Sequence, residues 1–558
     1  MATNAREVGS NPPRTYFSVW QRLLRGYGPL AVLAALLLMV SLLIPSKVQQ
    51  SGVSTTGASR QNATTANGAK GATATTAPGA TAGAGGTAPG ATDPNAAAAA
   101  QQGSVAAGVT PCPGDQVSGD PYSPPCMQFS GDNGGATYHG VNATEIHVAI
   151  RMLNEKGFQQ TLASLAGASL SDTPDDVKRT IEALGEYFNS HYQFYGRHIV
   201  WDFYNGVGSN TDELLGKGRD KAEADATTVQ SMGSFADMTA NSEPYANALA
   251  QNDIVGFGDP YLSVQWHDEH APYIWSIASA GTEVANFAAE YATKKLCGKN
   301  ADYAGGDLKG KPRKFATFAP ENSWYQESVQ VSRDTFTAAG CDPGVNVQYQ
   351  LDLGTMSNQA ANLVAQMQSQ GVTTIVCGCD PIIPVFLSSR AASQGYFPEF
   401  IIVGTALTDT DIVGQLWDQS FAKHAFGVSS LTEPAPVQQS IGYAAYKSVR
   451  QDEPAFSVDL IYYQMAQMAI GLQMAGPNLT PETFRDGMFA YPRKLGPAGS
   501  WGFSEHDYTT ADDVREICWD PNAISNYNQK QGAFVETDHK RYTQGNIPAG
   551  DPQIPVPQ

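Results

Sequence analysis

Short polar loops that follow predicted strands hold the side chains best suited to bind a ligand. Such loops lie at 233–237 and 258–261 in the first half of the chain and at 321–325, 378–380 and 404–405 in the second. Parallel strands bring loops of this kind to one edge of a sheet, where backbone NH groups, hydroxyls and helix N-termini can hold a small molecule. The residues that we expect to contact it are Ser234, Asp237, Asp259, Tyr261, Trp324, Tyr325, Asp380 and Thr405.

Several of these residues also have a purely structural interpretation. Asp259 precedes a proline and could cap a turn. Asp380 precedes Pro381 and could cap the helix that this proline opens. Trp324 and Tyr325 could be core residues, although the first turn of a helix favours the wall of a cleft. The sequence has no Gly-x-Ser-x-Gly turn and no nucleophile with a recognisable base, so we expect no catalytic residues and no enzyme activity.

The elements that must position these loops alternate between strand and helix patterns, which is typical of parallel α/β sheets. Segment 145–152 predicts the first strand, and Thr173 and Pro174 predict the cap and first residue of the next helix. A second series with the same alternation begins with a helix at 283–296 and runs to a strand at 400–403, so we expect two sheets. Other predicted elements are a helix at 211–230, a strand at 232–235, and helical stretches at 437–449 and 458–474 that return to the first sheet.

This order of elements resembles the type I periplasmic binding fold, specifically the Leu/Ile/Val-binding-like substrate-binding proteins of ABC importers. The resemblance is carried by 140–150 (Gly-Val-Asn-Ala-Thr-Glu-Ile-His-Val-Ala-Ile), 374–396, 400–405, 501–504 and 532–535. It implies an α/β fold of two lobes, each a parallel sheet flanked by helices, with ligand bound between them. It also implies three interlobe crossovers, which we place near Ala280, Ser430 and Gly496.

One loop departs from this family. Amino-acid-binding members place an acidic residue after the strand that corresponds to 400–403, where it meets the ligand ammonium group. Here the loop reads Gly404-Thr405-Ala406-Leu407, without an acid. We therefore hypothesise that the ligand is another small polar or amphipathic metabolite rather than a free branched-chain amino acid.

Seven cysteines lie after residue 110, and an exported setting would permit disulfides. Cys112 and Cys126 flank a segment rich in Pro, Gly and Asp and form the first expected pair; Cys297 and Cys341, each at the end of a predicted helix, form the second. Cys377 or Cys379 could join Cys518, and the odd count leaves at least one thiol unpaired. No second cluster at zinc spacing accompanies Cys-Gly-Cys, so we expect no metal and no cofactor.

The apolar run Leu-Ala-Val-Leu-Ala-Ala-Leu-Leu-Leu-Met-Val-Ser-Leu-Leu-Ile at 30–44 predicts where the protein works. With residues 27–29 it reaches about 18 residues, near the lower limit for a membrane span. Arg6, Arg14, Arg22 and Arg25 precede it, so the positive-inside rule predicts a single-pass anchor with a cytoplasmic N-terminus and an extracytoplasmic remainder. A cleaved signal peptide is the alternative, although no A-x-A-like cleavage site follows the run.

Composition and charge complete the expected organisation. The net charge of −19, from 34 Lys and Arg against 53 Asp and Glu, excludes nucleic acid as a partner. The expected parts are a cytoplasmic segment at 1–26, an anchor at 27–45, a disordered Ala/Gly/Thr-rich tether at 46–110, a Cys-bridged extension at 111–139, the binding domain at 140–541 and a tail at 542–558. Within the binding domain we expect lobe 1 at about 140–280 and 430–495, and lobe 2 at about 281–429 and 496–541.

These features together predict a membrane-tethered extracytoplasmic protein that captures a small solute and delivers it to an ABC permease in the same membrane. The alternative is an ectodomain that reports its ligand to a separate signalling partner, because a cytoplasmic segment of about 26 residues is too short to signal by itself.

Overall fold

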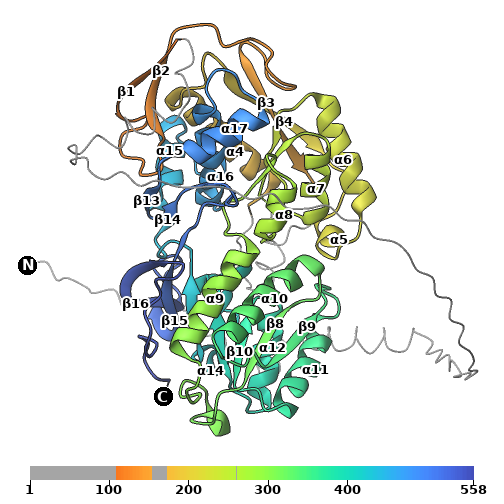
Figure 1. Ribbon diagram of the computed structural model, residues 1–558, viewed down its shortest axis with the longest axis vertical. Helices are drawn as coiled ribbons and strands as arrows, with labels where there is room; N and C mark the ends of the chain where they lie inside the picture. Colours follow the sequence, from red (N-terminus) through yellow and green to blue (C-terminus); the bar gives the residue numbers. More distant parts are fainter. Residues whose placement is uncertain (1–107, 154–171, 259–260, 558) are drawn as a thin grey trace, which may run out of the picture. The chain divides into compact units, whose positions relative to one another are not determined.

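Two separate sheets organise this protein into two lobes (Figure 1). The sheet of lobe 1 is parallel, as expected, whereas that of lobe 2 adds two antiparallel strands to a parallel core. The computed structural model describes residues 108–153, 172–258 and 261–557, and the statements below concern those residues. The predicted cytoplasmic segment, anchor and most of the tether lie outside them. Among the described residues, no helix is both long enough and apolar enough to cross a membrane.

Lobe 1 is built on a five-stranded parallel sheet with the order β4-β3-β5-β6-β7. Its strands are β3 (Glu145–Met152), β4 (His198–Asn205), β5 (Ala236–Asp237), β6 (Val255–Phe257) and β7 (Ile274–Trp275). The helices between them are α4 (Pro174–His191), α5 (Asn210–Leu214), α6 (Arg219–Met232), α7 (Glu243–Gln251) and α8 (Val264–Glu269). The predicted cap of α4 is confirmed, since Thr173 and Asp176 form a reciprocal capping box and Pro174 begins the helix.

Two predictions in lobe 1 are wrong, and glycines explain both. The single helix expected at 211–230 is split into α5 and α6, because Gly216 and Gly218 adopt left-handed φ angles of 71° and 67° between them. The strand expected at 232–235 begins later. Helix α6 continues to Met232 and ends at the left-handed Gly233, so the strand is β5 at Ala236–Asp237.

Lobe 2 is built on a seven-stranded sheet with the order β16-β15-β12-β11-β10-β8-β9. Strands β8 (Phe315–Pro320), β9 (Val345–Tyr349), β10 (Thr374–Cys377), β11 (Glu399–Ile402) and β12 (Ala425–Ser429) are parallel. Strands β15 (Asp513–Ile524) and β16 (Gln531–Thr543) continue the sheet in antiparallel pairing. Short 3-10 turns lie at Gly306–Leu308 and Thr405–Leu407.

Helices cover both faces of this second sheet. On one face α9 (Gly281–Lys295) and α10 (Ser323–Ala338) pack against strand residues such as Val376 and Ile401. On the other face α11 (Met356–Ser369), α12 (Ile383–Ser393), α13 (Asp411–Gly414) and α14 (Gln419–Ala422) pack against residues such as Ile375 and Ile402. Successive strand residues thus point to opposite faces, as the pleat requires.

The chain returns to lobe 1 after β12, as predicted. A 3-10 turn (Val437–Gln439) leads to α15 (Ile441–Val449), α16 (Val458–Met474) and α17 (Pro481–Ala490), whose apolar residues share the core of lobe 1. The hairpin of β13 (Lys494–Gly496) and β14 (Gly499–Trp501) follows. Trp501 and Tyr508 also belong to the lobe 1 core, so the last crossover lies after 508 rather than near Gly496.

The two ends of the described chain are both packed on the lobes. Strands β1 (Val109–Asp115) and β2 (Pro125–Phe129) form an antiparallel hairpin, and Tyr122 between them is fully buried in the lobe 1 core. Strand β1 therefore begins inside the range expected for the tether. At the other end, the tail follows α9, where the Glu290 carboxylate accepts hydrogen bonds from the backbone NH groups of Gly545 and Ile547 at 2.7 and 2.9 Å.

The cysteine predictions are confirmed for two pairs and wrong for the third. Disulfides join Cys112 to Cys126 and Cys297 to Cys341. Cys377 pairs with Cys379 instead of Cys518, which is a buried free thiol. Strands β11 and β12 separate Cys377 from Cys518, and the two side chains pack into the cores on opposite faces of the sheet, so they cannot meet.

Replacement of both Cys112 and Cys126 by Ser is expected to lower the free energy of unfolding by about 2–3 kcal/mol, because the crosslink closes a loop of about 15 residues in the unfolded chain. Chemical denaturation monitored by tryptophan fluorescence measures the change. The matched control is Cys518→Ser, which removes a thiol but no crosslink. An unfolding free energy unchanged in the double variant would contradict the prediction.

Candidate functional site

A cavity opens at the edge of lobe 2 where the parallel strands β8, β10 and β11 end. It lies between α9 and α10 and has a volume of about 50 Å³. Its walls are Gly281, Val284, Ala285 and Ala288 of α9, Tyr325, Ser328, Val329 and Ser332 of α10, strand and loop residues Thr317, Phe318, Val376, Gly378, Val403 and Thr405, and Tyr261. The cavity thus has the position that the sequence predicts for a ligand, beyond the carboxyl ends of parallel strands.

Among the described residues that line the cavity, Tyr261 is the one that comes from lobe 1. It follows β6, and its hydroxyl donates a hydrogen bond to the carbonyl of Gly404 in lobe 2 at 3.4 Å. Burial raises the pKa of this phenol above its ordinary value, so Tyr261 remains a neutral donor at physiological pH. The side chain therefore joins the two lobes at the mouth of the cavity.

Backbone strain concentrates at this contact. Tyr261, Ala406 and Leu407 adopt left-handed φ angles of 55°, 50° and 66°. Such angles are unfavourable for residues with a Cβ atom and cluster at ligand-binding and switch regions of proteins. The loop after β11 and the loop after β6 are thus held in uncommon conformations where they meet.

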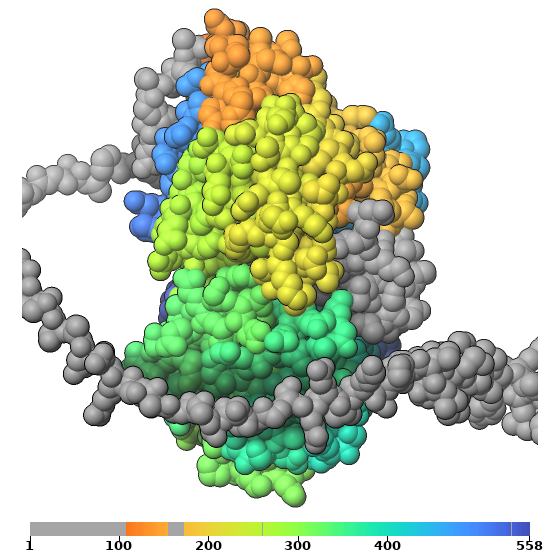
Figure 2. All heavy atoms as spheres, turned by 90° about the vertical axis from the view of Figure 1, so that its right-hand side faces the viewer, coloured from red at the N-terminus to blue at the C-terminus, as the bar shows by residue number. Residues whose placement is uncertain are grey.

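A second contact between the lobes lies at the N-terminus of α10. The Asn322 side-chain amide donates a hydrogen bond to the carbonyl of Leu214 in α5 at 3.0 Å. Trp324 packs against the apolar cluster of lobe 1 beside Gly216. In Figure 2 the yellow surface of the region around α5 and α6 lies next to the green surface of lobe 2. Trp324 is therefore an interlobe residue rather than part of the cavity wall.

The structure brings together three of the eight residues expected to contact a ligand. Tyr261, Tyr325 and Thr405 line the cavity. Asp259 lies outside the described residues. Ser234 precedes β5 and is fully buried at the amino end of that strand, the opposite end from the ligand edge. The prediction for Ser234 failed because the strand was placed too early: a strand at 232–235 would have put Ser234 at its carboxyl end, whereas β5 begins only at Ala236.

Asp237 is fully buried inside lobe 1 and is already hydrogen-bonded. Its carboxylate accepts from the Thr239 NH and hydroxyl at 2.7 and 2.5 Å and from the Tyr245 hydroxyl at 2.8 Å. Burial raises its pKa to about 6, and these hydrogen bonds oppose the rise. Asp237 thus holds the loop after β5 in place and does not reach the cavity.

Asp380 has a similar structural role in lobe 2, and its helix-capping interpretation agrees with the geometry. Its carboxylate accepts from the Tyr349 hydroxyl at 2.5 Å and from the NH groups of Ile382 and Ile383 at 2.7 and 3.2 Å. The side chain lies next to the cavity residue Gly378 in sequence but is committed to these three donors.

The cavity walls formed by α9 and α10 were not predicted from the sequence. Gly281, Ala285 and Ala288 recur at helical spacing on α9, and Ser328 and Ser332 do so on α10. Small residues at such spacing leave room between two packed helices, which is the signal that could have indicated a cavity. Gly281 is under the tightest constraint, since a Cβ atom there would lie 2.2 Å from the Tyr261 carbonyl oxygen.

Three carboxyl groups lie where the first and third crossovers run side by side. Glu283 of α9 accepts hydrogen bonds from the Ala280 NH and the Thr509 hydroxyl, both at 2.9 Å. Asp507 lies just before the third crossover, and Asp512 lies in it, directly before β15. Burial raises the pKa of each of the three groups to about 7, with repulsion between carboxylates adding to the rise.

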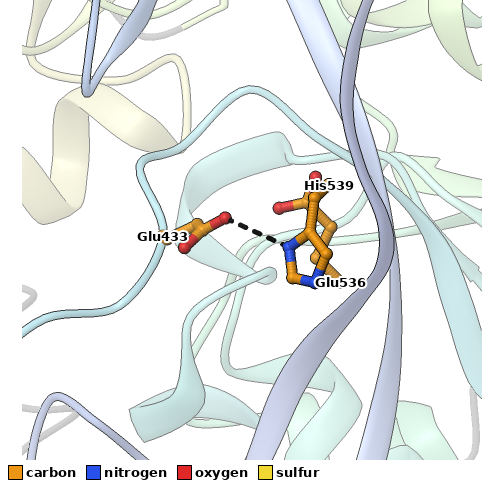
Figure 3. Close-up of side chains that lie close together, drawn as sticks. All are labelled: Glu433, Glu536 and His539. Carbon is orange, nitrogen blue, oxygen red and sulfur yellow. Dashed lines mark ion pairs between the residues drawn. The ribbon is translucent and has the colours of Figure 1, made fainter.

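A separate cluster joins Glu433, in the segment that follows β12, to Glu536 and His539 of β16 (Figure 3). Their potential metal-ligating atoms all lie within 4.8 Å of one another, and Glu433 and His539 are exposed. His539 Nδ1 is 3.7 Å from Glu433, and Arg515 Nη1 is 3.5 Å from Glu536. Because Arg515 already compensates the charge of Glu536, we interpret the cluster as a network of ion pairs.

Comparisons with known proteins agree with this geometry. A family profile described as periplasmic binding protein matches residues 164–520. A leucine-, isoleucine-, valine-, threonine- and alanine-binding protein from Brucella ovis has a similar structure, with a TM-score of 0.50, 12% identity, and coverage of 74% of this chain and 98% of that one. No curated protein matches the chain in sequence.

Two further solved structures are similar to this chain. An ABC transporter substrate-binding protein from Aeropyrum pernix has a TM-score of 0.50 and 12% identity, covering 72% of this chain and 96% of that one. A fatty acid ABC transporter substrate-binding protein from Thermomonospora curvata has a TM-score of 0.49 and 14% identity, covering 73% and 94%. At these identities the likeness concerns the fold alone.

Proposed function

This chain belongs to the type I periplasmic binding protein family, and we propose on that basis that it is a membrane-tethered extracytoplasmic solute-binding protein. It captures a small polar or amphipathic metabolite between its two lobes, leaves it chemically unchanged, and delivers it to an ABC-type permease. The apolar run at 30–44 and the Ala/Gly/Thr-rich stretch that follows are the sequence features that support an anchor and a tether.

The observation that carries the proposal is the position of Tyr261. A lobe 1 side chain forms part of the wall of a lobe 2 cavity and bonds the strained loop at 404–407. A molecule that enters this cavity would therefore contact both lobes, and its binding energy would favour the arrangement in which they are closed. Closure of the two lobes around a solute would allow a permease to distinguish the solute-bound protein from the empty one.

The proposal is tested by measuring lobe closure in the full-length protein. Small-angle scattering and thermal unfolding of the detergent-solubilised chain are followed across a solute library, together with mass spectrometry of small molecules that co-purify. We expect at least one solute to compact the protein and raise its melting temperature without being converted. A library in which no solute changes either quantity would contradict the proposal.

Trp324→Ala is expected to weaken solute affinity by about tenfold, because the variant loses apolar contact between the lobes that is present only when they are closed. Isothermal titration with a solute identified by the library measures the loss. Trp266→Ala is the matched control. Trp266 also packs on the lobe 1 cluster, but its ring stacks on His270 of lobe 1, with 3.7 Å between the ring centroids. Equal loss in both variants would contradict the assigned role of Trp324.

A further inference from the structure

The chemistry of the cavity walls restricts what can enter. The side chains that line the cavity are apolar or carry a neutral hydroxyl group, and no Asp, Glu, Lys, Arg or His is among the lining residues that the structure describes. Burying a charged group without a partner of opposite charge is strongly unfavourable. The walls therefore favour an uncharged group.

The cavity is small. Its lining residues run from Gly281 to Ala288 on α9 and from Tyr325 to Ser332 on α10. Each span is a rise of about 10 Å along its helix. Its volume of about 50 Å³ is about one third of the roughly 150 Å³ of an apolar cavity that binds benzene. A short chain of about four carbon atoms fits this volume better than a ring.

A hydrogen-bonding group lies at the inner end of this cavity. Ser332 is 4% exposed, and its hydroxyl has no hydrogen-bond partner among the described residues. A buried hydroxyl left without a partner costs about 1–3 kcal/mol. By contrast, the Ser328 hydroxyl donates to the Trp324 carbonyl at 3.5 Å, and Thr317 donates to Asn346 Oδ1 at 3.3 Å. Ser332 is thus the wall residue that gains most from a polar atom on the ligand.

The charged residues next to the cavity have other partners. Arg333 follows Ser332, but its guanidinium donates to the carbonyls of Pro343 and Gly344 and to the Thr317 hydroxyl, at 3.0–3.4 Å. Asp380 accepts the three hydrogen bonds described above. Neither residue lines the cavity. A ligand charge at the inner end would therefore have no charged wall residue to meet.

We propose that the cavity between α9 and α10 binds a short, uncharged alkyl chain whose far end carries a hydroxyl or carbonyl oxygen that hydrogen-bonds to Ser332. This subsite deepens the proposed function and rests on it, because it names the part of the solute that enters lobe 2. The remaining part of the solute, charged or uncharged, stays at the mouth near Tyr261 and Thr405.

Two series of probes test the subsite in the full-length protein by isothermal titration. One is pentanoate, its omega-hydroxy derivative and glutarate; the other is pentylamine, its omega-hydroxy derivative and cadaverine. Within a series the head group is constant and only the far end of the chain changes. We expect the methyl-ended and hydroxy-ended members of at least one series to bind, and the doubly charged member to bind at least about tenfold more weakly.

Variants separate the two parts of the subsite. Ser332→Ala is expected to weaken the hydroxy-ended probe by about fivefold, since one hydrogen bond is lost, and to leave the methyl-ended probe unchanged. Ala288→Leu fills the cavity and is expected to weaken both probes by at least about tenfold. Ala338→Leu makes the same substitution at an exposed position of α10 and serves as the control.

The outcomes distinguish this inference from the proposed function. Glutarate or cadaverine binding as tightly as the uncharged-ended members, the absence of binding by all six probes, or an Ser332→Ala effect equal for both chain ends would each overturn the subsite. Lobe closure with another solute in the library would then still support solute binding. Failure of every solute to close the lobes would contradict the proposed function itself.

Discussion

Glu399→Gln is expected to lower the free energy of unfolding by about 3–5 kcal/mol, because it leaves the Arg313 guanidinium buried without its counter-ion. The two side chains are 0% and 3% exposed and form two parallel hydrogen bonds, both of 2.8 Å. The Glu399 carboxylate also accepts from the Thr374 hydroxyl at 2.6 Å and the Tyr303 NH at 3.2 Å. This pair ties β10 and β11 to the segment that follows α9.

Chemical denaturation of Glu399→Gln and of Glu182→Gln measures this effect against a matched control. Glu182 pairs with Lys178 at 4.0 Å, and both side chains are nearly half exposed, so its loss is expected to change stability by no more than about 0.5 kcal/mol. A double variant with Arg313→Met and Glu399→Leu is expected to recover most of the lost stability. Equal effects of the two Glu→Gln changes would show that burial does not decide the strength of the Arg313 pair.

Raising the pH from about 5.5 to about 7.5 is expected to lower the free energy of unfolding by about 4 kcal/mol through Glu283, Asp507 and Asp512. Burial raises the pKa of each group to about 7 in the folded chain. The folded state then holds protons that the unfolded state releases, so this stability is present at low pH and lost as the pH rises through about 7. The magnitude counts about two net protons rather than three, because the three carboxyl groups interact and titrate as a coupled set.

Urea denaturation across this pH range tests the prediction in the variant Glu283→Gln, Asp507→Asn. The variant is expected to show a flatter dependence of stability on pH than the unaltered chain. Asp237, whose pKa of about 6 is also raised by burial, contributes to the slope in both proteins and does not affect their difference. Identical slopes would mean that the crossover carboxyls do not take up protons on folding.

The alternation of elements and most of their positions could be predicted from the sequence. Strand β3 at 145–152, the capped start of α4 and the full extent of α16 agree with periodicity and capping signals. The family resemblance implied two lobes and a sheet edge at which ligand binds. The family profile confirms the family. The errors arose where a short element could be placed in more than one register, as at β5, or where glycines divide one periodic stretch into two helices.

The candidate site was predictable only in part. Tyr261, Tyr325 and Thr405 follow strands and were found by that position. Asp237 and Asp380 follow strands as well, but their hydrogen bonds to Tyr245 and Tyr349 commit them to structure. Those tyrosines are 8 and 31 residues away in sequence, and no local signal indicates that they are the partners.

The sequence by itself determined the fold class, the alternation of strands and helices, two of the three cysteine pairs and the sheet edge at which the candidate cavity lies, because capping, periodicity and parallel topology produce local sequence patterns. Only the tertiary structure decided which side chains at that edge line the cavity and which are committed to hydrogen bonds within the fold. It also decided that Trp324 contacts lobe 1 and that small residues of α9 and α10 leave a cavity that reaches Ser332. Those features depend on which surfaces meet after residues distant in sequence have packed, and packing is a property of the whole domain.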